Sequence, residues 1–307
     1  MPPRAAASRA FAVDWGSLGP LRLKARALAE GLYSGAHRSV RKGAGVEFGG
    51  QRPYVPGDDL RFFDRRALLR HDRLMVREFE TETDRALWLV VDATASMSYR
   101  SERAPGAKLA YAALMAATLA RVALSSHDPV GLSFVGGASV HPVPAMSGRE
   151  AFDRVVGVLE GAQAEGDATA DAGAMERSLA PIARRARRGS VIVLLSDLLD
   201  LPPRAREAFL QLATGGRALV VSRVLDPAER DLDFQGTVRL KALEGGAVVE
   251  ADPEVVRAGY QERLAAIGAR WSEELSSRGG RFLEATTSAS PSEAVRAVVQ
   301  SIAEARR

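Results

Sequence analysis

The chain of 307 residues has no cysteine. This absence excludes disulfide frameworks, zinc–thiolate sites and cysteine nucleophiles, and it is compatible with a reducing compartment. Long uncharged stretches are missing too, because the longest helical one, Leu109 to Ala120, is too short for a bilayer and is followed by Arg121. The first residues, Met1-Pro2-Pro3-Arg4, do not resemble a secretory signal. We therefore expect a cytoplasmic protein without a membrane span.

Aromatic residues are scarce, at 6%, and the excess of basic over acidic residues is only +4. Two arginine pairs, Arg184-Arg185 and Arg187-Arg188, are the strongest candidates for nucleic-acid contacts, but no aromatic side chain is interleaved with them. Such pairs are more typical of the cationic end of a helix, where they complement its dipole. Nucleic-acid binding is therefore the weakest functional hypothesis.

From Leu87 onward, short apolar runs alternate with helical segments. This alternation predicts an α/β fold with a doubly wound, mostly parallel sheet of strand order 3-2-1-4-5-6. The turn at Gly136-Gly137 predicts an antiparallel hairpin at one edge of the sheet. The expected strands are 87–92, 129–135, 139–143, 190–195, 218–224 and 281–285. The expected helices are 21–33, 105–125, 148–161, 170–187, one opening at 202–203, 253–277 and one starting at 290.

Two apolar runs end in an acidic residue, one at Asp92 and the other at Asp197. In the expected strand order these two strands are neighbours at the point where the order reverses, which is where open α/β sheets bind ligands. Thr94 and Ser96 follow the first strand, and Thr169 lies in a loop before a helix. Two carboxylates and several hydroxyls suit a hard divalent cation, Mg²⁺ before Mn²⁺ or Ca²⁺. A strand-end Asp followed by hydroxyl residues is equally a helix cap, so the motif at Asp92 alone does not decide between the two.

The same residues resemble the metal-ion-dependent adhesion site (MIDAS) of von Willebrand factor A-like domains. That pattern is Asp-x-Ser-x-Ser, then a Thr, then an Asp after a later strand. Here Asp92, Thr94 and Ser96 match its first part, with Thr in place of the first Ser, while Thr169 and Asp197 match the rest. The resemblance implies a Rossmann-type domain that holds Mg²⁺ and accepts an acidic residue of another protein.

A second resemblance concerns the charged stretch before this domain, which looks like the signature of domain-of-unknown-function family 58 (DUF58). Its members carry this stretch just before a von Willebrand factor A-like domain and are commonly encoded beside MoxR-type AAA+ ATPases. Phe63-Asp64-Arg65 departs from the usual Ile-Asp-Trp. The matching residues are Glu47-Phe48, Arg52-Pro53-Tyr54, Pro56-Gly57-Asp58-Asp59, Arg61, Asp64, Val76-Arg77-Glu78-Phe79-Glu80 and Glu82.

Together, the residue patterns and these resemblances predict three parts. They are an N-terminal extension with a short helix (1–44), a charged segment packed on the main domain (45–84), and the von Willebrand factor A-like domain (85–307) with an insertion at about 226–252. The charged segment is either an internal ion-pair network or a docking surface whose charges select a partner. As a docking surface it would use Asp58, Asp59, Arg61, Asp64 and Arg77.

The function we expect is a non-enzymatic, metal-dependent adaptor for a MoxR-type ATPase, in complex assembly or in cofactor or metal insertion. The alternative is a metal-dependent phosphoester hydrolase that uses Asp92 as nucleophile in the same crevice. Against it, Thr94 stands where such enzymes need a second Asp, no lysine follows the strand ending at Asp197 at an obvious position, and the four histidines are scattered.

Overall fold

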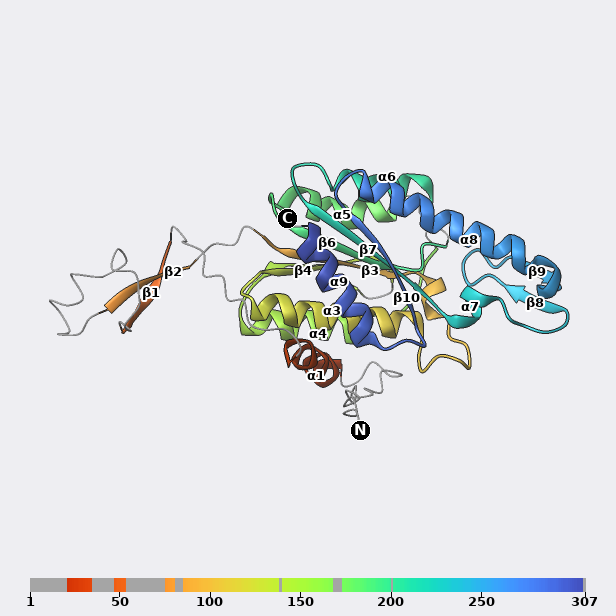
Figure 1. The fold of residues 1–307 in the computed structure, drawn as a ribbon, viewed down its shortest axis with the longest axis horizontal. Coiled ribbons are helices and arrows are strands. Elements are labelled where there is room, and N and C mark those ends of the chain that lie inside the picture. The colour runs from red at the N-terminus through yellow and green to blue at the C-terminus, as the bar shows by residue number, and fades with distance from the viewer. Residues whose placement is uncertain are drawn as a thin grey trace, which may run out of the picture. The chain divides into compact units, whose positions relative to one another are not determined.

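The computed structural model describes residues 21–34, 47–53, 75–80, 85–137, 140–167, 173–199 and 201–305. The chain divides into two units (Figure 1). The smaller comprises residues 37–84, and the larger comprises the remainder.

The larger unit is built around a six-stranded sheet of order β10-β7-β6-β3-β4-β5. All neighbouring strands run parallel except β4 and β5, which form an antiparallel pair at one edge. In chain order this is 3-2-1-4-5-6, so the predicted doubly wound sheet is confirmed. The strands are β3 (Leu87–Ala93), β4 (Val130–Gly136), β5 (Val143–Met146), β6 (Val191–Ser196), β7 (Ala218–Leu225) and β10 (Arg281–Thr286).

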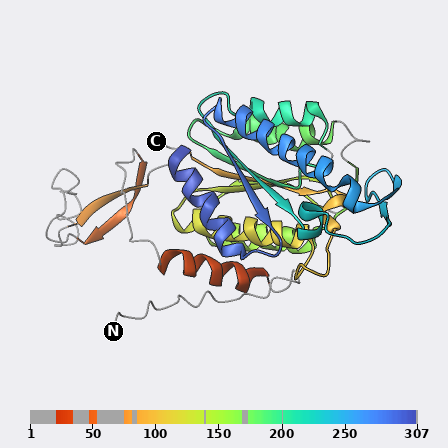
Figure 2. The same cartoon turned by 45° about the vertical axis from the view of Figure 1, so that its right-hand side comes forward.

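Helices cover both faces of this sheet (Figure 2). One face carries α1 (Leu21–Ser34), α3 (Lys108–Ser125), α4 (Arg149–Gly161) and α9 (Pro291–Ala305), and the other carries α5 (Ala174–Arg185), α6 (Pro203–Gln211) and α8 (Pro253–Ser276). Successive side chains of a strand point to opposite faces. The sheet therefore has a hydrophobic core on each face. Leu89 and Val91 of β3 belong to the first core, on the face of α1 and α3, and Trp88 and Val90 belong to the second core, on the face of α5 and α6.

Helix α3 lies at the centre of the first core. In the described part of the chain it is the one helix long and apolar enough, by length and composition, to cross a membrane, and 72% of it is buried inside the protein. Its many alanines let α1, α4 and α9 pack against it. The apolar side chains of α3 are therefore buried in the protein core. Its first residue, Lys108, is a charged exception.

Strand β5 differs from the expectation of a strand at 139–143, because it runs from Val143 to Met146. The antiparallel register pairs Leu132 with Val143 and Val130 with Met146. Pro142, just before the strand, has no N–H to donate to a ladder, which favours pairing that begins after it.

The structure also contains two short helices that were not predicted from the sequence. These are the 3₁₀-helix η2 (Ala95–Ser98), directly after β3, and α7 (Pro227–Asp231), directly after β7. Helix α7 begins with a capping box, in which the Asp226 side chain accepts from the N–H of Ala228 and the N–H of Asp226 donates to the Glu229 side chain.

Between α7 and α8 the chain forms a two-stranded antiparallel hairpin of β8 (Val238–Lys241) and β9 (Val248–Ala251). Gly245 and Gly246 in its turn have φ of 68° and 69°, a conformation that favours glycine. The hairpin lies beside α7 and the N-terminal end of α8 in both views (Figures 1 and 2).

In the smaller unit, β1 (Glu47–Pro53) pairs antiparallel with β2 (Met75–Glu80), with Phe48 opposite Phe79. Arg77 lies in β2 opposite Gln51. The other predicted docking residues, Asp58, Asp59, Arg61 and Asp64, lie outside the described residues.

Candidate functional site

The end of β3 and the turn after it bring three oxygen-bearing side chains together. Asp92 is the penultimate residue of β3, and its Oδ1 accepts hydrogen bonds from the N–H (3.0 Å) and the hydroxyl (2.7 Å) of Thr94. The Thr94 Oγ1 also lies 3.2 Å from the Oγ of Ser96. All three residues are buried. The tight turn into η2 therefore aims a carboxylate and two hydroxyls at one another.

The end of the neighbouring strand β6 supplies a hydrogen-bond partner for Asp92 and, directly after it, a second carboxylate. The Ser196 hydroxyl donates to Asp92 Oδ2 at 2.5 Å and accepts from the N–H of Leu198. Asp197, also buried, accepts from the N–H of Leu199 at 3.2 Å. Both predicted strand-end carboxylates thus lie at the same edge of the sheet, on adjacent strands.

A lysine that the sequence reasoning missed is part of this edge. Lys108 is fully buried at the start of α3, and its Nζ donates to Asp197 Oδ2 (2.7 Å) and Glu229 Oε1 (2.6 Å). Glu229 comes from α7, one of the two helices that were not expected. The available signal was a single lysine opening an otherwise apolar, alanine-rich helix.

The electrostatics of the edge are those of a buried excess of negative charge. Burial, and next the charge of Asp197, raise the pKa of Asp92 to about 6, although hydrogen bonds from Ser196 and Thr94 oppose the shift. Burial alone would lower the pKa of Lys108, but Asp197 and Glu229 outweigh it and raise that pKa, so the ammonium stays charged. Burial also raises the pKa of Glu229. One lysine therefore faces several carboxylates, an imbalance that a bound cation would reduce.

The donor set fits a hard divalent cation. Octahedral Mg²⁺ has oxygen ligands at about 2.1 Å, so adjacent ligand oxygens lie about 3.0 Å apart. The distances from Thr94 Oγ1 to Asp92 Oδ1 (2.7 Å) and to Ser96 Oγ (3.2 Å) bracket that length. Among the residues that the structure describes, no group of three or more His, Cys, Asp or Glu side chains could hold a metal. A cation at this edge would therefore depend on the hydroxyl oxygens.

Thr169, the third predicted hydroxyl, lies outside the described residues, and its place in the site stays a prediction. The loop that leads to it is described as far as residue 167. In that loop the N–H of Glu165 donates to the carbonyl of Ala93 (2.8 Å), and the carbonyl of Gly166 accepts from Ala95 (3.0 Å). The loop is thus hydrogen-bonded to the same turn that carries Thr94.

A further acidic side chain reaches the turn from the β8–β9 hairpin. Glu244 is 8% exposed, and its Oε1 accepts a hydrogen bond from the N–H of Ser96 at 3.2 Å, across 148 positions of sequence. Beside it, a Cβ built on Gly245 would lie 3.6 Å from a carboxylate oxygen of Asp167. No pattern in the sequence marks Glu244, apart from its place before the Gly245-Gly246 turn.

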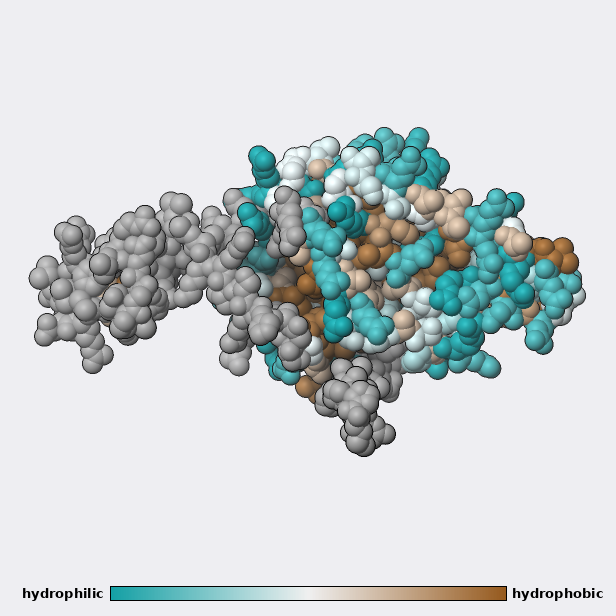
Figure 3. Space-filling model, in the orientation of Figure 1, coloured by the Kyte–Doolittle hydropathy of each residue, from teal (hydrophilic) through white to brown (hydrophobic). Residues whose placement is uncertain are grey.

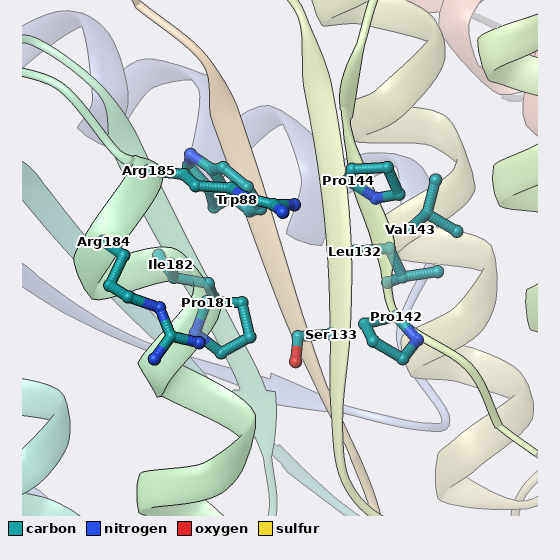
Figure 4. Close-up of a pocket in the computed structure, with 10 residues that line it drawn as sticks. All are labelled: Trp88, Leu132, Ser133, Pro142, Val143, Pro144, Pro181, Ile182, Arg184 and Arg185. Atoms are coloured by element: carbon teal, nitrogen blue, oxygen red, sulfur yellow. The ribbon is translucent and has the colours of Figure 1, made fainter.

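A separate hollow of about 250 Å³ lies between α5 and strands β3, β4 and β5 (Figure 4). Trp88, near the start of β3, lines this hollow, whereas Asp92 lies near the end of the same strand. Arg184 and Arg185, in the last turn of α5, line it. The hollow is therefore distinct from the acidic edge. Its lining residues are Trp88, Leu132, Ser133, Pro142, Val143, Pro144, Pro181, Ile182, Arg184 and Arg185.

Comparison with known proteins assigns the chain to a family. Residues 50–270 match the model of a family described as "Protein of unknown function DUF58". The chain belongs to the DUF58 family. This confirms the resemblance seen in the charged segment and extends it over most of the chain.

An uncharacterized protein of Mycobacterium tuberculosis, Rv1480, is 30% identical over 243 residues, which are 76% of this chain and 72% of that protein. Among solved structures, BatB from Bacteroides thetaiotaomicron is similar with a TM-score of 0.45 and 17% identity, covering 72% of this chain and 98% of that one. The SpRpn10 VWA domain is similar with a TM-score of 0.39 and 11% identity, covering 69% of this chain and 93% of that one.

Proposed function

We propose that this DUF58 protein is a non-enzymatic, divalent-cation-dependent protein-binding module. The observation that carries the proposal is the convergence of Asp92, Thr94 and Ser96 at spacings that suit one octahedral cation. The surplus of buried carboxylates around Lys108 supports it independently. Asp197 belongs to this site, and Thr169 is proposed as its remaining hydroxyl.

When bound, the cation would supply a Lewis-acidic position open to an acidic side chain of another protein. The chain's own groups provide the rigidity that such a site needs. Ser196 fixes the second oxygen of Asp92, and Lys108 fixes Asp197. Mg²⁺ is the proposed cation because two hydroxyls and a carboxylate are hard oxygen donors, and Mn²⁺ has similar preferences.

The proposed partner is a cytoplasmic MoxR-type AAA+ ATPase, with the acidic residue belonging to a client protein. Support comes from membership of the DUF58 family and from the association that the resemblance implies. In this proposal the segment 45–84, with Asp58, Asp59, Arg61, Asp64 and Arg77, is the docking surface for the ATPase. The cation site would hold the client during complex assembly or during insertion of a cofactor or metal.

The test is recovery of bound proteins from native lysate with Mg²⁺ or with EDTA. Wild type is compared with Asp92→Ala and with Glu207→Ala, which removes an exposed carboxylate on α6. Recovery of a MoxR-type ATPase and its client that needs both Mg²⁺ and Asp92, but not Glu207, would support the proposal. Equal recovery in all lanes would contradict a role for the cation site and favour the charged segment. Absence of any ATPase would contradict the partner.

The alternative of a phosphoester hydrolase places a reacting phosphoryl group in the same crevice. Lys108 is a cation that such an enzyme would need, but it is fully buried and already bound to Asp197 and Glu229. It is therefore not free to bind a phosphoryl group. Turnover of p-nitrophenyl phosphate that disappears in Asp92→Asn would favour the hydrolase over the binding module.

A further inference from the structure

The hollow beside α5 combines an apolar floor with a basic rim (Figure 4). Buried side chains from β3, β4, β5 and α5 form the floor: Trp88, Leu132, Ser133, Val143 and Ile182. Exposed side chains form the rim, among them Arg184 and Arg185. None of the described residues that line the hollow is acidic. The charge of this lining is therefore positive.

The two rim arginines have no ion-pair or hydrogen-bond partner within the described part of the chain. Both belong to the last turn of α5, where basic side chains commonly complement the helix dipole. The carbonyl groups at this helix end are bound by Arg217, whose Nε donates to Ala186 (2.8 Å) and whose Nη2 donates to Ala183 (3.2 Å). Arg184 and Arg185 are thus not needed to satisfy the end of the helix, and their guanidinium groups can bind an anion.

Trp88 gives the hollow an aromatic wall. Its indole packs on Gly131 of the neighbouring strand β4, where an added Cβ would lie 2.4 Å from Cε3. The indole Nε1 is buried and has no hydrogen-bond acceptor among the described residues. The buried hydroxyl of Ser133, in contrast, donates to the carbonyl of Ser178 at 2.8 Å. The side-chain polar groups of the lining that lack a partner are therefore all donors, which an anion complements and a cation does not.

The size of the hollow suits a small molecule. Large apolar side chains that face solvent, and so suit a larger surface, gather instead at the β8–β9 hairpin, for example Leu240 and Val249 (brown at the hairpin end in Figure 3). The volume of the hollow is about 250 Å³. Benzene binds in an engineered apolar cavity of about 150 Å³, whereas sites for drug-sized ligands measure roughly 300–1,000 Å³. One ring or branched chain with a short acidic group is therefore of the right size.

We propose that this hollow binds a small organic carboxylate. Its apolar body lies against the floor, beside Trp88, and its carboxylate pairs with Arg184 and Arg185. A guanidinium presents paired N–H groups that match the two oxygens of a carboxylate. A phosphate is less favoured, because the rim is at the C-terminal end of α5, whose dipole opposes a dianion more than a monoanion, and phosphate sites commonly use helix N-termini. This site is separate from the proposed cation site and does not depend on it.

The experiment uses phenylacetate as the probe, with three matched compounds. Phenylacetamide keeps the shape and loses the charge, acetate keeps the charge and loses the ring, and benzylphosphonate carries more charge. Tryptophan fluorescence of the full-length protein reports binding, because Trp88 lines the hollow and is one of three tryptophans in the chain. We expect saturable binding of phenylacetate with a dissociation constant on the order of 1 mM. Phenylacetamide should bind about tenfold more weakly, and acetate and benzylphosphonate should also bind more weakly.

Four variants locate the ligand. Arg184→Gln and Arg185→Gln should each weaken phenylacetate binding about two- to fivefold, as is typical of exposed ion pairs, and their combination should weaken it about tenfold. Binding of phenylacetamide should not change in these variants. Arg188→Gln removes an exposed arginine that does not line the hollow, and this matched control should bind as wild type does. Trp88→Phe should abolish the fluorescence change, while calorimetry should still detect binding.

Several results would overturn the inference. They are the absence of saturable phenylacetate binding, equal affinities for phenylacetate and phenylacetamide, and wild-type affinity in the double arginine variant. A fluorescence change that persists in Trp88→Phe would place the ligand beside another tryptophan and would overturn it as well. Thermal unfolding checks that each variant is folded, and the exposed arginines preserve the test if Trp88→Phe loosens the core. None of these outcomes bears on the cation site.

Discussion

Replacing Asp92 by Asn should make the cation-free protein more stable at neutral pH while abolishing cation binding. Asp92 is buried, and burial together with the charge of Asp197 raises its pKa from 3.8 to about 6. A raised pKa in the folded state means that folding favours the protonated acid. The favourable contribution is fully present below pH 3.8, and it is lost as the pH rises through 6.

The magnitude follows from that shift. A difference of about two pKa units corresponds to about 3 kcal/mol, which is the cost of keeping Asp92 ionised in the fold above pH 6. Asn removes this cost but loses the acceptor that Asp92 Oδ2 offers to the Ser196 hydroxyl. Such a loss is worth about 1 kcal/mol. We therefore expect Asp92→Asn to be about 2 kcal/mol more stable than wild type at pH 7.5 in EDTA.

The assay is urea unfolding in EDTA at a series of pH values. The advantage of Asp92→Asn should shrink below pH 6, vanish between about pH 4 and 5, and reverse at lower pH, because wild type then no longer carries the buried charge but still accepts from the Ser196 hydroxyl. Asp153→Asn changes an exposed carboxylate on α4 that pairs with Arg22, and it should shift stability by less than about 1 kcal/mol at every pH. An Asp92→Asn protein that is less stable than wild type at pH 7.5, or a difference that does not change with pH, would show that Asp92 carries no costly buried charge.

Two further substitutions test the packing behind the site. Lys108→Met leaves the buried Asp197 and the largely buried Glu229 without their cation and should cost about 3–5 kcal/mol in urea unfolding. Lys241→Met on the exposed hairpin should change stability by less than about 0.5 kcal/mol, and similar losses in both would contradict the role of Lys108. Gly131→Ala places a Cβ 2.4 Å from Trp88 Cε3 and should lower the free energy of unfolding by about 1–3 kcal/mol. Gly157→Ala in α4 places a Cβ with nothing within 4 Å and should raise the free energy of unfolding by up to about 1 kcal/mol. Equal melting temperatures for the two glycine variants would show that the indole does not pack on Gly131.

The sheet could be predicted from the sequence because its central strands are short, continuous apolar runs bounded by turn residues. The runs ending at Asp92 and Asp197 are buried on both faces, so their composition alone identifies them. Once strand order was inferred from the alternation of elements, the meeting of these two carboxylates at one edge followed from topology.

The rest of the site depends on contacts that no local pattern encodes. Lys108 meets Asp197 across 89 positions, and Glu244 meets Ser96 across 148. Each contact requires the placement of a whole element, the start of α3 in one case and the tip of a hairpin in the other. In the sequence a lysine at a helix start and a glutamate before a glycine turn are typical surface residues. Their burial is a property of the tertiary fold.

Binding of a divalent cation by Asp92 and its neighbours can be measured directly. The most direct measurement is calorimetric titration of Mg²⁺, and separately Mn²⁺, into wild type and Asp92→Asn at pH 7.5. We expect one cation bound per wild-type chain and none in Asp92→Asn, although the variant is folded and more stable. No cation bound to wild type, or equal binding by both proteins, would contradict it.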